Sequence, residues 1–170
     1  MGGSFTRRRV LEAAGVAGLG GIIGTASTAV AQQGWTSVSS PTGNTIYAVE
    51  HTAHGLTACG VGGEIHHRRK GKWKTEVKKG PSGNSKSLVA ADTTDDGERF
   101  WAVGSSGAVG EYRLGWKTIY DHSNPLGISS EFATVSVTGD AGDEHVFIGK
   151  PSGEVVVGER NSDGGFDWML

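Results

Sequence analysis

One short pattern occurs three times in the sequence, and this repetition limits the possible folds more than any other feature. Each copy has an apolar run, a glycine, a second glycine after two or three further residues, and an alternating segment that ends in arginine. The copies read LTACGVGGEIHHR, RFWAVGSSGAVGEYR and HVFIGKPSGEVVVGER. The paired glycines are Gly60 and Gly63, Gly104 and Gly107, and Gly149 and Gly153. We interpret each copy as a β-hairpin in which both glycines supply the positive φ values of a tight turn.

Further strands are expected on both sides of each hairpin. An extended segment precedes each hairpin, at 45–50, 86–92 and 132–138, and the segments that begin at a tryptophan, such as WTSV, WKTEV and WKTIY, give a fourth strand. The tryptophans of this series are Trp35, Trp73, Trp116 and Trp168, at intervals of 38, 43 and 52 residues. Four short strands with a period near forty and an aromatic residue at a fixed place are typical of propeller blades.

The sequence therefore predicts an all-β, propeller-like fold with three four-stranded blades. The repeat domain covers 32–170, with repeats at about 35–72, 73–115 and 116–168. A content of 29 glycines against 4 prolines agrees with many tight turns and few long helices. The apolar residues expected in the core between the sheets are Ile46, Val49, Leu88, Val103, Val135, Val137, Phe147 and Ile148.

These repeats resemble a known family. The stretch GWTSVSSPTGNTIYAVE, followed by ACGVGGEI and GKW, is similar to the BNR/Asp-box type of repeat, in the form found in photosystem II assembly and stability factors. Near the end of the chain, NSDGGFDW resembles the Asp-box S-x-D-x-G-x-x-W, with Asp163, Gly165 and Trp168 at the motif positions and Asn161 in place of the leading serine. The resemblance covers about 32–168 and implies a propeller. It does not specify an activity, because such repeats occur in enzymes, receptors and assembly factors.

Residues 1–31 have the features of an export signal. Arg7, Arg8 and Arg9 precede a mildly apolar run that is rich in glycine and alanine and ends in Ala-Val-Ala. A threonine, paired arginines and then Val10-Leu11 resemble a twin-arginine signal. We therefore expect an exported, extracytoplasmic protein, and we consider retention of this segment as a membrane anchor the weaker alternative.

The charge is unevenly distributed along the chain. Residues 32–120 contain 11 basic and 8 acidic side chains, whereas 121–170 contain 2 basic and 9 acidic ones. A nucleic-acid binder is not expected to have this balance. The most concentrated basic group is Arg68, Arg69, Lys70, Lys72 and Lys74. It is interpreted first as a charged strand edge that discourages aggregation, and alternatively as a patch for an anionic protein or envelope partner.

No motif in the sequence specifies catalytic, cofactor or metal chemistry. The GVGG loop lacks the Lys-Ser/Thr of a phosphate-binding loop, and His66 and His67 are adjacent, so on a strand they face opposite sides of the sheet. We expect solvated histidines. Cys59 is the single cysteine, which excludes an internal disulfide and predicts a buried, unreactive thiol. The acidic groups ADTTDDGER and TGDAGDEH are expected to serve turns.

Three repeats are fewer than the roughly four to eight blades of a closed propeller. We consider a propeller fragment, a ring closed by a second copy, an open arc and a different packing of the repeats. The predicted function is an exported, non-catalytic binding or scaffold protein with a protein or envelope partner. One alternative is a sialidase-like or other glycoside-processing enzyme, which needs arginines such as Arg113 and Arg160 and a carboxylate in one cleft. The other is a module that binds a small ligand.

Overall fold

The computed structural model describes residues 38–115 and 118–170, and the part from Val38 to Leu170 forms one compact unit. In the described residues, twelve strands form three separate four-stranded antiparallel sheets, which confirms the predicted all-β, propeller-like fold. Blade 1 consists of β1 (Ile46–Thr52), β2 (Gly55–Gly60), β3 (Ile65–Arg69) and β4 (Lys72–Val77). Blade 2 consists of β5 (Leu88–Thr93), β6 (Arg99–Gly104), β7 (Val109–Arg113) and β8 (Thr118–Asp121). Blade 3 consists of β9 (Thr134–Thr138), β10 (His145–Gly149), β11 (Val155–Arg160) and β12 (Phe166–Met169).

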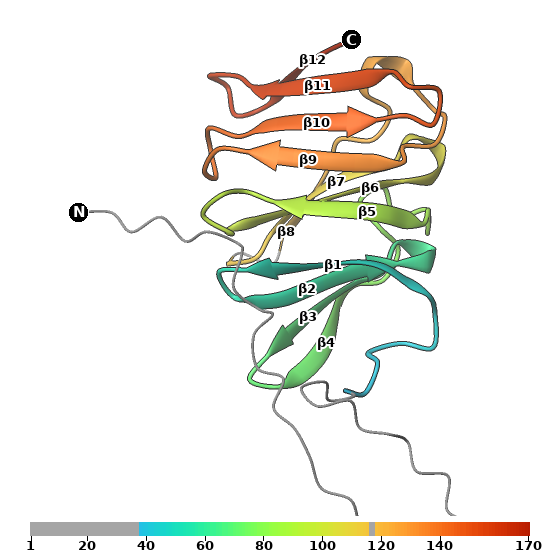
Figure 1. Ribbon diagram of the computed structural model, residues 1–170, viewed down its shortest axis with the longest axis vertical. Helices are drawn as coiled ribbons and strands as arrows, with labels where there is room; N and C mark the ends of the chain where they lie inside the picture. Colours follow the sequence, from blue (N-terminus) through green and yellow to red (C-terminus); the bar gives the residue numbers. More distant parts are fainter. Residues whose placement is uncertain (1–37, 116–117) are drawn as a thin grey trace, which may run out of the picture. The chain divides into compact units, whose positions relative to one another are not determined.

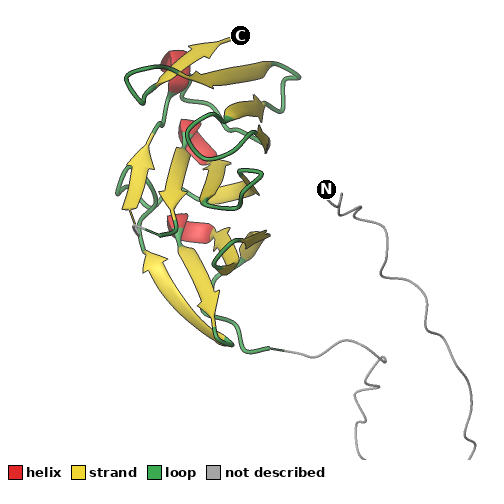
Figure 2. Ribbon diagram, turned by 90° about the vertical axis from the view of Figure 1, so that its left-hand side faces the viewer, coloured by secondary structure: helices red, strands yellow, loops and turns green. Residues whose placement is uncertain are grey.

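Within each blade the strands follow their order in the sequence, and the first strands of the three blades are neighbours. Figure 1 shows β1, β5 and β9 side by side, with blade 1 extending downward, blade 3 upward and blade 2 to the rear. Figure 2 shows the same fan of three sheets from the side. The three short helical turns are η1 (Val61–Gly63), η2 (Ser105–Gly107) and η3 (Pro125–Gly127). No helix among the described residues is long and apolar enough to cross a membrane.

Two apolar layers hold blade 2 between its neighbours. On one side, Phe100, Ala102 and Tyr112 of blade 2 pack with Cys59 and Ile65 of blade 1. The second layer combines residues of blade 2 with residues of blade 3 and the segment before it: Trp101, Val103, Val109, Phe132, Val135, Val137, Val146, Ile148 and Val156. Successive residues of a strand point to opposite faces, so β6 supplies both layers.

The glycine prediction is only half right. The second glycine of each pair has a positive φ, as at Gly107, where φ is +69°. The first glycine is extended: Gly104 has a φ of 179°. It is required for a different reason, because a Cβ on Gly104 would lie 1.9 Å from the carbonyl oxygen of Ser87. The same close approach occurs at Gly60, where a Cβ would lie 2.1 Å from the carbonyl oxygen of Thr45.

Two tryptophans of the repeat series lie within the described residues, and each is in the outermost strand of its sheet. Trp73 lies in β4 and Trp168 in β12, and both are partly buried, while Trp35 and Trp116 lie outside the described residues. Trp101, which the repeat pattern did not include, is fully buried in the layer between blades 2 and 3. The sheets are offset from the predicted repeats, because the strand that contains Trp73 is the last strand of blade 1 rather than the first strand of the next repeat.

The predicted core contains two errors, and both occur on the end blades. Leu88, Val103, Val135, Val137 and Ile148 are buried, and Ile46 is half-buried. Val49 of blade 1 is 51% exposed and Phe147 of blade 3 is 38% exposed. Both residues lie in short continuous apolar runs, which predicts burial, but the described residues include no blade that covers them.

Candidate functional site

Where blades 2 and 3 meet, charged side chains from both blades converge on the carboxylate of Glu111. Glu111 on β7 is fully buried. Arg113 Nε donates a hydrogen bond to its Oε1 at 2.6 Å, and Arg160 Nη2, from β11, donates to its Oε2 at 3.0 Å. His122 Nε2 lies 3.2 Å from the same Oε2, and Arg99 Nη1 lies 3.4 Å from Oε1. Arg99 and Arg113 face each other in the β6–β7 ladder, which places both guanidinium groups at one end of blade 2.

A second buried carboxylate comes from the loop before β10. Glu144 is fully buried and accepts a hydrogen bond from Arg160 Nη2 at 2.5 Å and another from Arg99 Nη1. The backbone N–H of Gly142 donates to its Oε2 at 2.6 Å. Three guanidinium groups therefore surround two carboxylates, and Arg160 contacts both. We call Arg99, Glu111, Arg113, Glu144 and Arg160 the ionic joint.

The ionic joint keeps its carboxylates charged. Burial by itself would raise the pKa of Glu111, but hydrogen bonds from His122 and Arg113 and the charges of Arg160 and Arg99 lower that pKa to about 2. Burial also opposes ionisation of Glu144, and the hydrogen bonds from Arg160 and from the Gly142 N–H lower its pKa. The two carboxylates raise the pKa of Arg160 despite its burial.

Aromatic rings pack next to the ionic joint, on the side of the outer strands. Trp101 stacks on His122 with ring centroids 5.1 Å apart, and Phe166 meets Trp101 edge-on at 5.0 Å. The guanidinium carbon of Arg160 lies 4.4 Å from the ring centre of Phe166. Cation–π and aromatic contacts of this kind add to the packing between blades.

The acidic group 92–96, predicted to serve turns, connects blade 2 to blade 3. Asp92 Oδ2 accepts a hydrogen bond from the Val137 N–H at 2.8 Å, and Asp95 Oδ2 accepts one from Gly139 at 2.9 Å. Asp96 Oδ2 accepts one from Ala141 at 3.0 Å. Asp96 also makes turn contacts, to Thr94 Oγ1 at 2.6 Å and to the Glu98 N–H at 3.1 Å. Turn chemistry is therefore only part of the role of this group, because its carboxylates bind the backbone of the next blade.

A cavity of 160 Å³ lies next to the joint and is lined by Glu98, Arg99, Arg113, Gly115 and Ala141. Ligand pockets for drug-sized molecules are roughly 300–1,000 Å³. Arg113 and Arg160 do meet a common carboxylate, but that carboxylate is buried between blades rather than displayed in a cleft. This geometry suits a structural joint between the two blades. No group of three or more potential metal ligands occurs in the described part of the chain.

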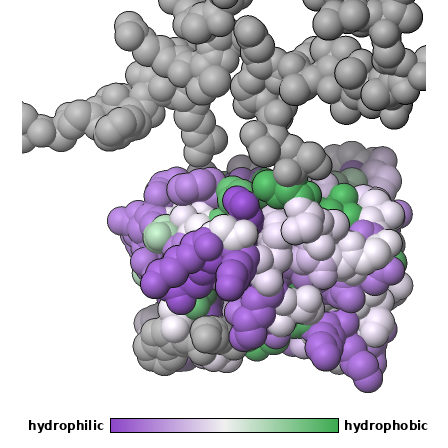
Figure 3. All heavy atoms as spheres, turned by 90° about the horizontal axis from the view of Figure 1, so that it is seen from below, coloured by the Kyte–Doolittle hydropathy of each residue, from purple (hydrophilic) through white to green (hydrophobic). Residues whose placement is uncertain are grey.

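The basic patch lies on the β3–β4 hairpin. Arg69, Lys70, Lys72 and Lys74 are exposed, whereas Arg68 is partly buried. In Figure 3 the molecule is seen from below, and the surface there is largely hydrophilic. Its role toward an anionic partner remains a prediction.

The histidine prediction is wrong in one respect. His66 and His67 do face opposite sides, but both are buried, with exposed fractions of 1% and 6%. His66 Nδ1 lies 3.0 Å from Thr75 Oγ1, and His67 Nδ1 lies 2.9 Å from Thr57 Oγ1. Burial lowers the pKa of each. Cys59 is buried as predicted, and burial raises its pKa to about 12.

Asn161 organises the loop that leads into β12. Its Oδ1 accepts a hydrogen bond from the Gly165 N–H at 2.9 Å, and its Nδ2 donates to Asp167 Oδ1 at 3.1 Å. Asp163 is exposed. The side chain at the variant position therefore caps the turn that leads into β12.

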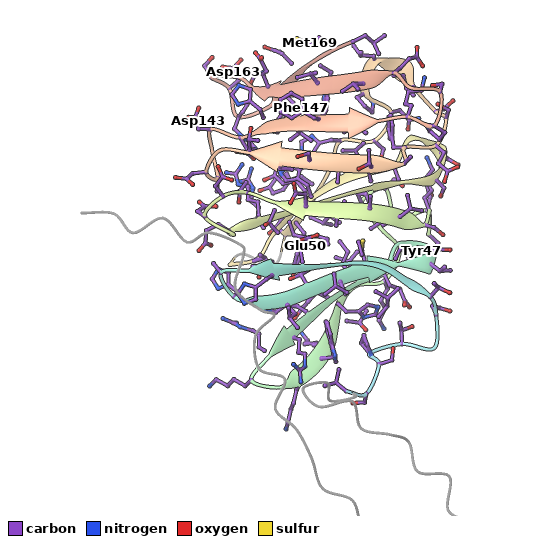
Figure 4. The ribbon with its side chains drawn as sticks, in the orientation of Figure 1. Tyr47, Glu50, Asp143, Phe147, Asp163 and Met169 are labelled. Atoms are coloured by element: carbon purple, nitrogen blue, oxygen red, sulfur yellow. The ribbon has the colours of Figure 1, made fainter. Side chains whose placement is uncertain are left out.

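The face of blade 3 turned away from blade 2 is uncovered in the described unit and carries exposed apolar side chains next to exposed polar ones. Phe147, Val155 and Met169 are 38%, 49% and 42% exposed. Strand pairing aligns Ser136, Phe147, Val157 and Met169 in one row across all four strands. Figure 4 shows Phe147 and Met169 on β10 and β12. We call Ser136, Phe147, Val155, Val157 and Met169 the blade 3 end face.

Blade 1 packs on the other side of blade 2. It has a corresponding face that is turned away from blade 2. Tyr47 and Val49 on β1 are each 51% exposed. Leu56, Arg68 and Trp73 are partly exposed, and Arg68 pairs with both Leu56 and Trp73 in the ladder. These five residues form the blade 1 end face.

Comparisons with known proteins agree with the fold. No family model matches the sequence, and no curated protein matches it. Among solved structures, the chain is similar to a propeller chain of the "Crystal Structure of Mitotic Checkpoint Complex", with a TM-score of 0.54 and 10% identity over 73% of this chain. The match spans 37% of that chain. A similarity at this level of identity shows the propeller-like fold and nothing about activity.

Proposed function

We propose that this chain is an exported, non-catalytic binding or scaffold protein built from BNR-like propeller blades. The observation that carries the proposal is the blade 3 end face. Phe147, Val155 and Met169 are exposed apolar residues on one face of a sheet whose other face packs on blade 2. Apolar groups gathered on one surface mark protein–protein contact sites. The proposed ligand is therefore a protein surface that covers this sheet.

The ionic joint supports a non-catalytic role. Its carboxylates are buried and occupied by arginines of the same chain, so they offer no free base or nucleophile. The Asn161-capped loop supports the Asp-box-like character of the third repeat. Both features serve the assembly of blades.

A residue-specific crosslink tests binding at the proposed surface. A photoreactive benzophenone amino acid is introduced at Phe147 in producing cells, and a matched one at Asn84, which is exposed in the connection between blades 1 and 2. Adducts of defined mass are expected on irradiation at position 147 and not at position 84. Equal labelling at both positions, or no adduct at 147, would contradict the proposal.

Export is supported by the sequence of residues 1–31, which lie outside the described residues. A double substitution, Arg7→Lys with Arg8→Lys, keeps the charge but removes the paired arginines of the twin-arginine motif. The variant is expected to accumulate inside the cell, while the unaltered chain appears outside. Fractionation followed by immunoblotting measures this, and Arg9→Lys serves as the control. Unchanged export of the double variant would argue against the twin-arginine route.

A further inference from the structure

We propose that the protein surface that covers blade 3 is blade 1 of a second copy of this chain, and that two such contacts close a ring of six blades. The inference rests on the proposed function, because it names the partner of the blade 3 end face. Three features of the molecule point to this partner: the positions of the exposed residues, the direction of the two end faces and the charges of the end blades.

The exposed residues of blade 3 occupy positions that are buried in blade 2. Val103 pairs with Val109 at the hairpin loop of blade 2, and Gly149 pairs with Val155 at the hairpin loop of blade 3. Strand pairing, unlike the alignment on the first glycine of each repeat, matches Gly149 with Val103, so Val155 corresponds to Val109 and Phe147 corresponds to Trp101. Val109 and Trp101 are fully buried against blade 3. The blade 3 end face therefore has the residue pattern of a sheet that packs against the next blade in a propeller.

Blade 1 has the complementary pattern. Val49 pairs with Ala58 in blade 1, just as Val135 pairs with Ile148 in blade 3. Val135 is 8% exposed because it packs on blade 2, whereas Val49 at the corresponding position is 51% exposed. Val49 therefore lies on the face that, in blade 3, packs against the preceding blade.

The two end faces also look in the same direction. Blade 2 lies behind blades 1 and 3 in Figure 1, and each end face is turned away from blade 2. Both therefore face the viewer of that figure. A second copy, turned by 180° about the axis of the fan, presents its blade 1 to blade 3 and its blade 3 to blade 1. One contact repeated twice in this way forms a closed twofold ring. Six blades lie within the range of roughly four to eight found in propellers.

The charges of the end blades favour this pairing over the alternatives. Residues 38–79, which hold blade 1, contain seven basic and three acidic side chains. Residues 122–170, which hold blade 3, contain two basic and eight acidic side chains. Blade 3 therefore attracts blade 1 and repels another blade 3. At the contact, Glu159 of β11 is exposed beside the blade 3 end face, and Arg68 belongs to the blade 1 end face.

Light scattering after size exclusion tests the ring. The purified protein is expected to have the mass of two chains. Phe147→Glu places a carboxylate in the acidic end face and is expected to weaken the dimer about 30-fold or more, as the loss of a central contact residue does. Asn84→Glu makes the same charge change away from both end faces and is expected to leave the dimer unchanged. Circular dichroism of each sample establishes that the blades remain folded.

A charge exchange gives a second, independent readout. Glu159→Arg alone is expected to weaken the dimer, and adding Arg68→Glu is expected to restore it, because the opposite charges again face each other. Folded monomers of the unaltered protein at high concentration, open-ended polymers, or a dimer insensitive to Phe147→Glu would each overturn the ring. A folded monomer that crosslinks through position 147 to a protein of different mass would refute the second copy while leaving the proposed binding function in place.

Discussion

Glu111→Gln is expected to lower the free energy of unfolding by about 3–5 kcal/mol, because it removes one charge from a buried network and leaves its partners without compensation. Glu111 is fully buried and contacts Arg113 at 2.6 Å and Arg160 at 3.0 Å. Urea denaturation followed by circular dichroism measures the change. The control is Glu98→Gln, since Glu98 is 46% exposed and pairs with His54 at 2.8 Å near the surface. That substitution is expected to cost less than about 1 kcal/mol.

The same variant has a characteristic pH dependence. The pKa of Glu111 in the folded protein is lowered from 4.5 to about 2, so its ionised form stabilises the fold above pH 4.5. This contribution is lost as the pH falls from 4.5 toward 2. The stability of the unaltered protein is therefore expected to fall across that interval, and Glu111→Gln is expected to reduce the slope. Glu144 retains part of the dependence, because its pKa is lowered as well. Equal slopes for both proteins would contradict the role given to Glu111.

Trp101→Ala is expected to destabilise the protein by about 3–5 kcal/mol, the usual cost of deleting a buried aromatic side chain. Trp101 is fully buried, belongs to the layer between blades 2 and 3, and contacts His122 and Phe166. Thermal and urea unfolding measure the effect.

Trp73→Ala is the matched control for this substitution, since Trp73 lies on the edge strand β4 and is only partly buried. Its expected cost is clearly smaller. If Trp73→Ala were the more damaging change, the repeat tryptophans rather than Trp101 would carry the packing between blades.

The sequence was sufficient to predict three four-stranded sheets, but not which sheet contains the Trp73 strand, since the predicted repeat 2 begins at Trp73 and the structure places β4 in blade 1. The three glycine hairpins and the extended segments around them have a period that only a blade-like repeat explains. The exact reason for each glycine was not accessible, because the approach of the Ser87 carbonyl to Gly104 depends on the path of the neighbouring strand.

The ionic joint could not be found from the sequence. Arg99, Glu111, Glu144 and Arg160 are separated by up to 61 positions and meet only when blade 3 packs on blade 2. The sequence did contain one signal. Glu111 is an acidic residue in the middle of a strand that is otherwise buried, and a charged side chain at such a position requires partners. The repeat alignment also missed Trp101, because no tryptophan occupies the corresponding place in the other two repeats.

The incorrect core assignments of Val49 and Phe147 have a physical explanation. Alternation within a strand identifies the faces of a sheet, but it does not identify which face has a neighbour. Both residues have the pattern of a blade inside a ring, and both lie on an end of the described array. Their exposure supports the proposal that the array is completed by another protein surface.

Oxidative footprinting of side chains tests that central proposal most directly. Hydroxyl radicals modify exposed aromatic, sulfur-containing and larger aliphatic side chains, and mass spectrometry locates the products. Tyr47, Phe147 and Met169 are 51%, 38% and 42% exposed in the single chain, and Leu126, which is 51% exposed and lies in η3, is the internal reference. At a concentration where the protein associates, we predict that oxidation of Tyr47, Phe147 and Met169 falls relative to a dilute sample, while that of Leu126 stays the same. Unchanged oxidation of all three residues would contradict the account, because it would mean that the end faces stay open to solvent.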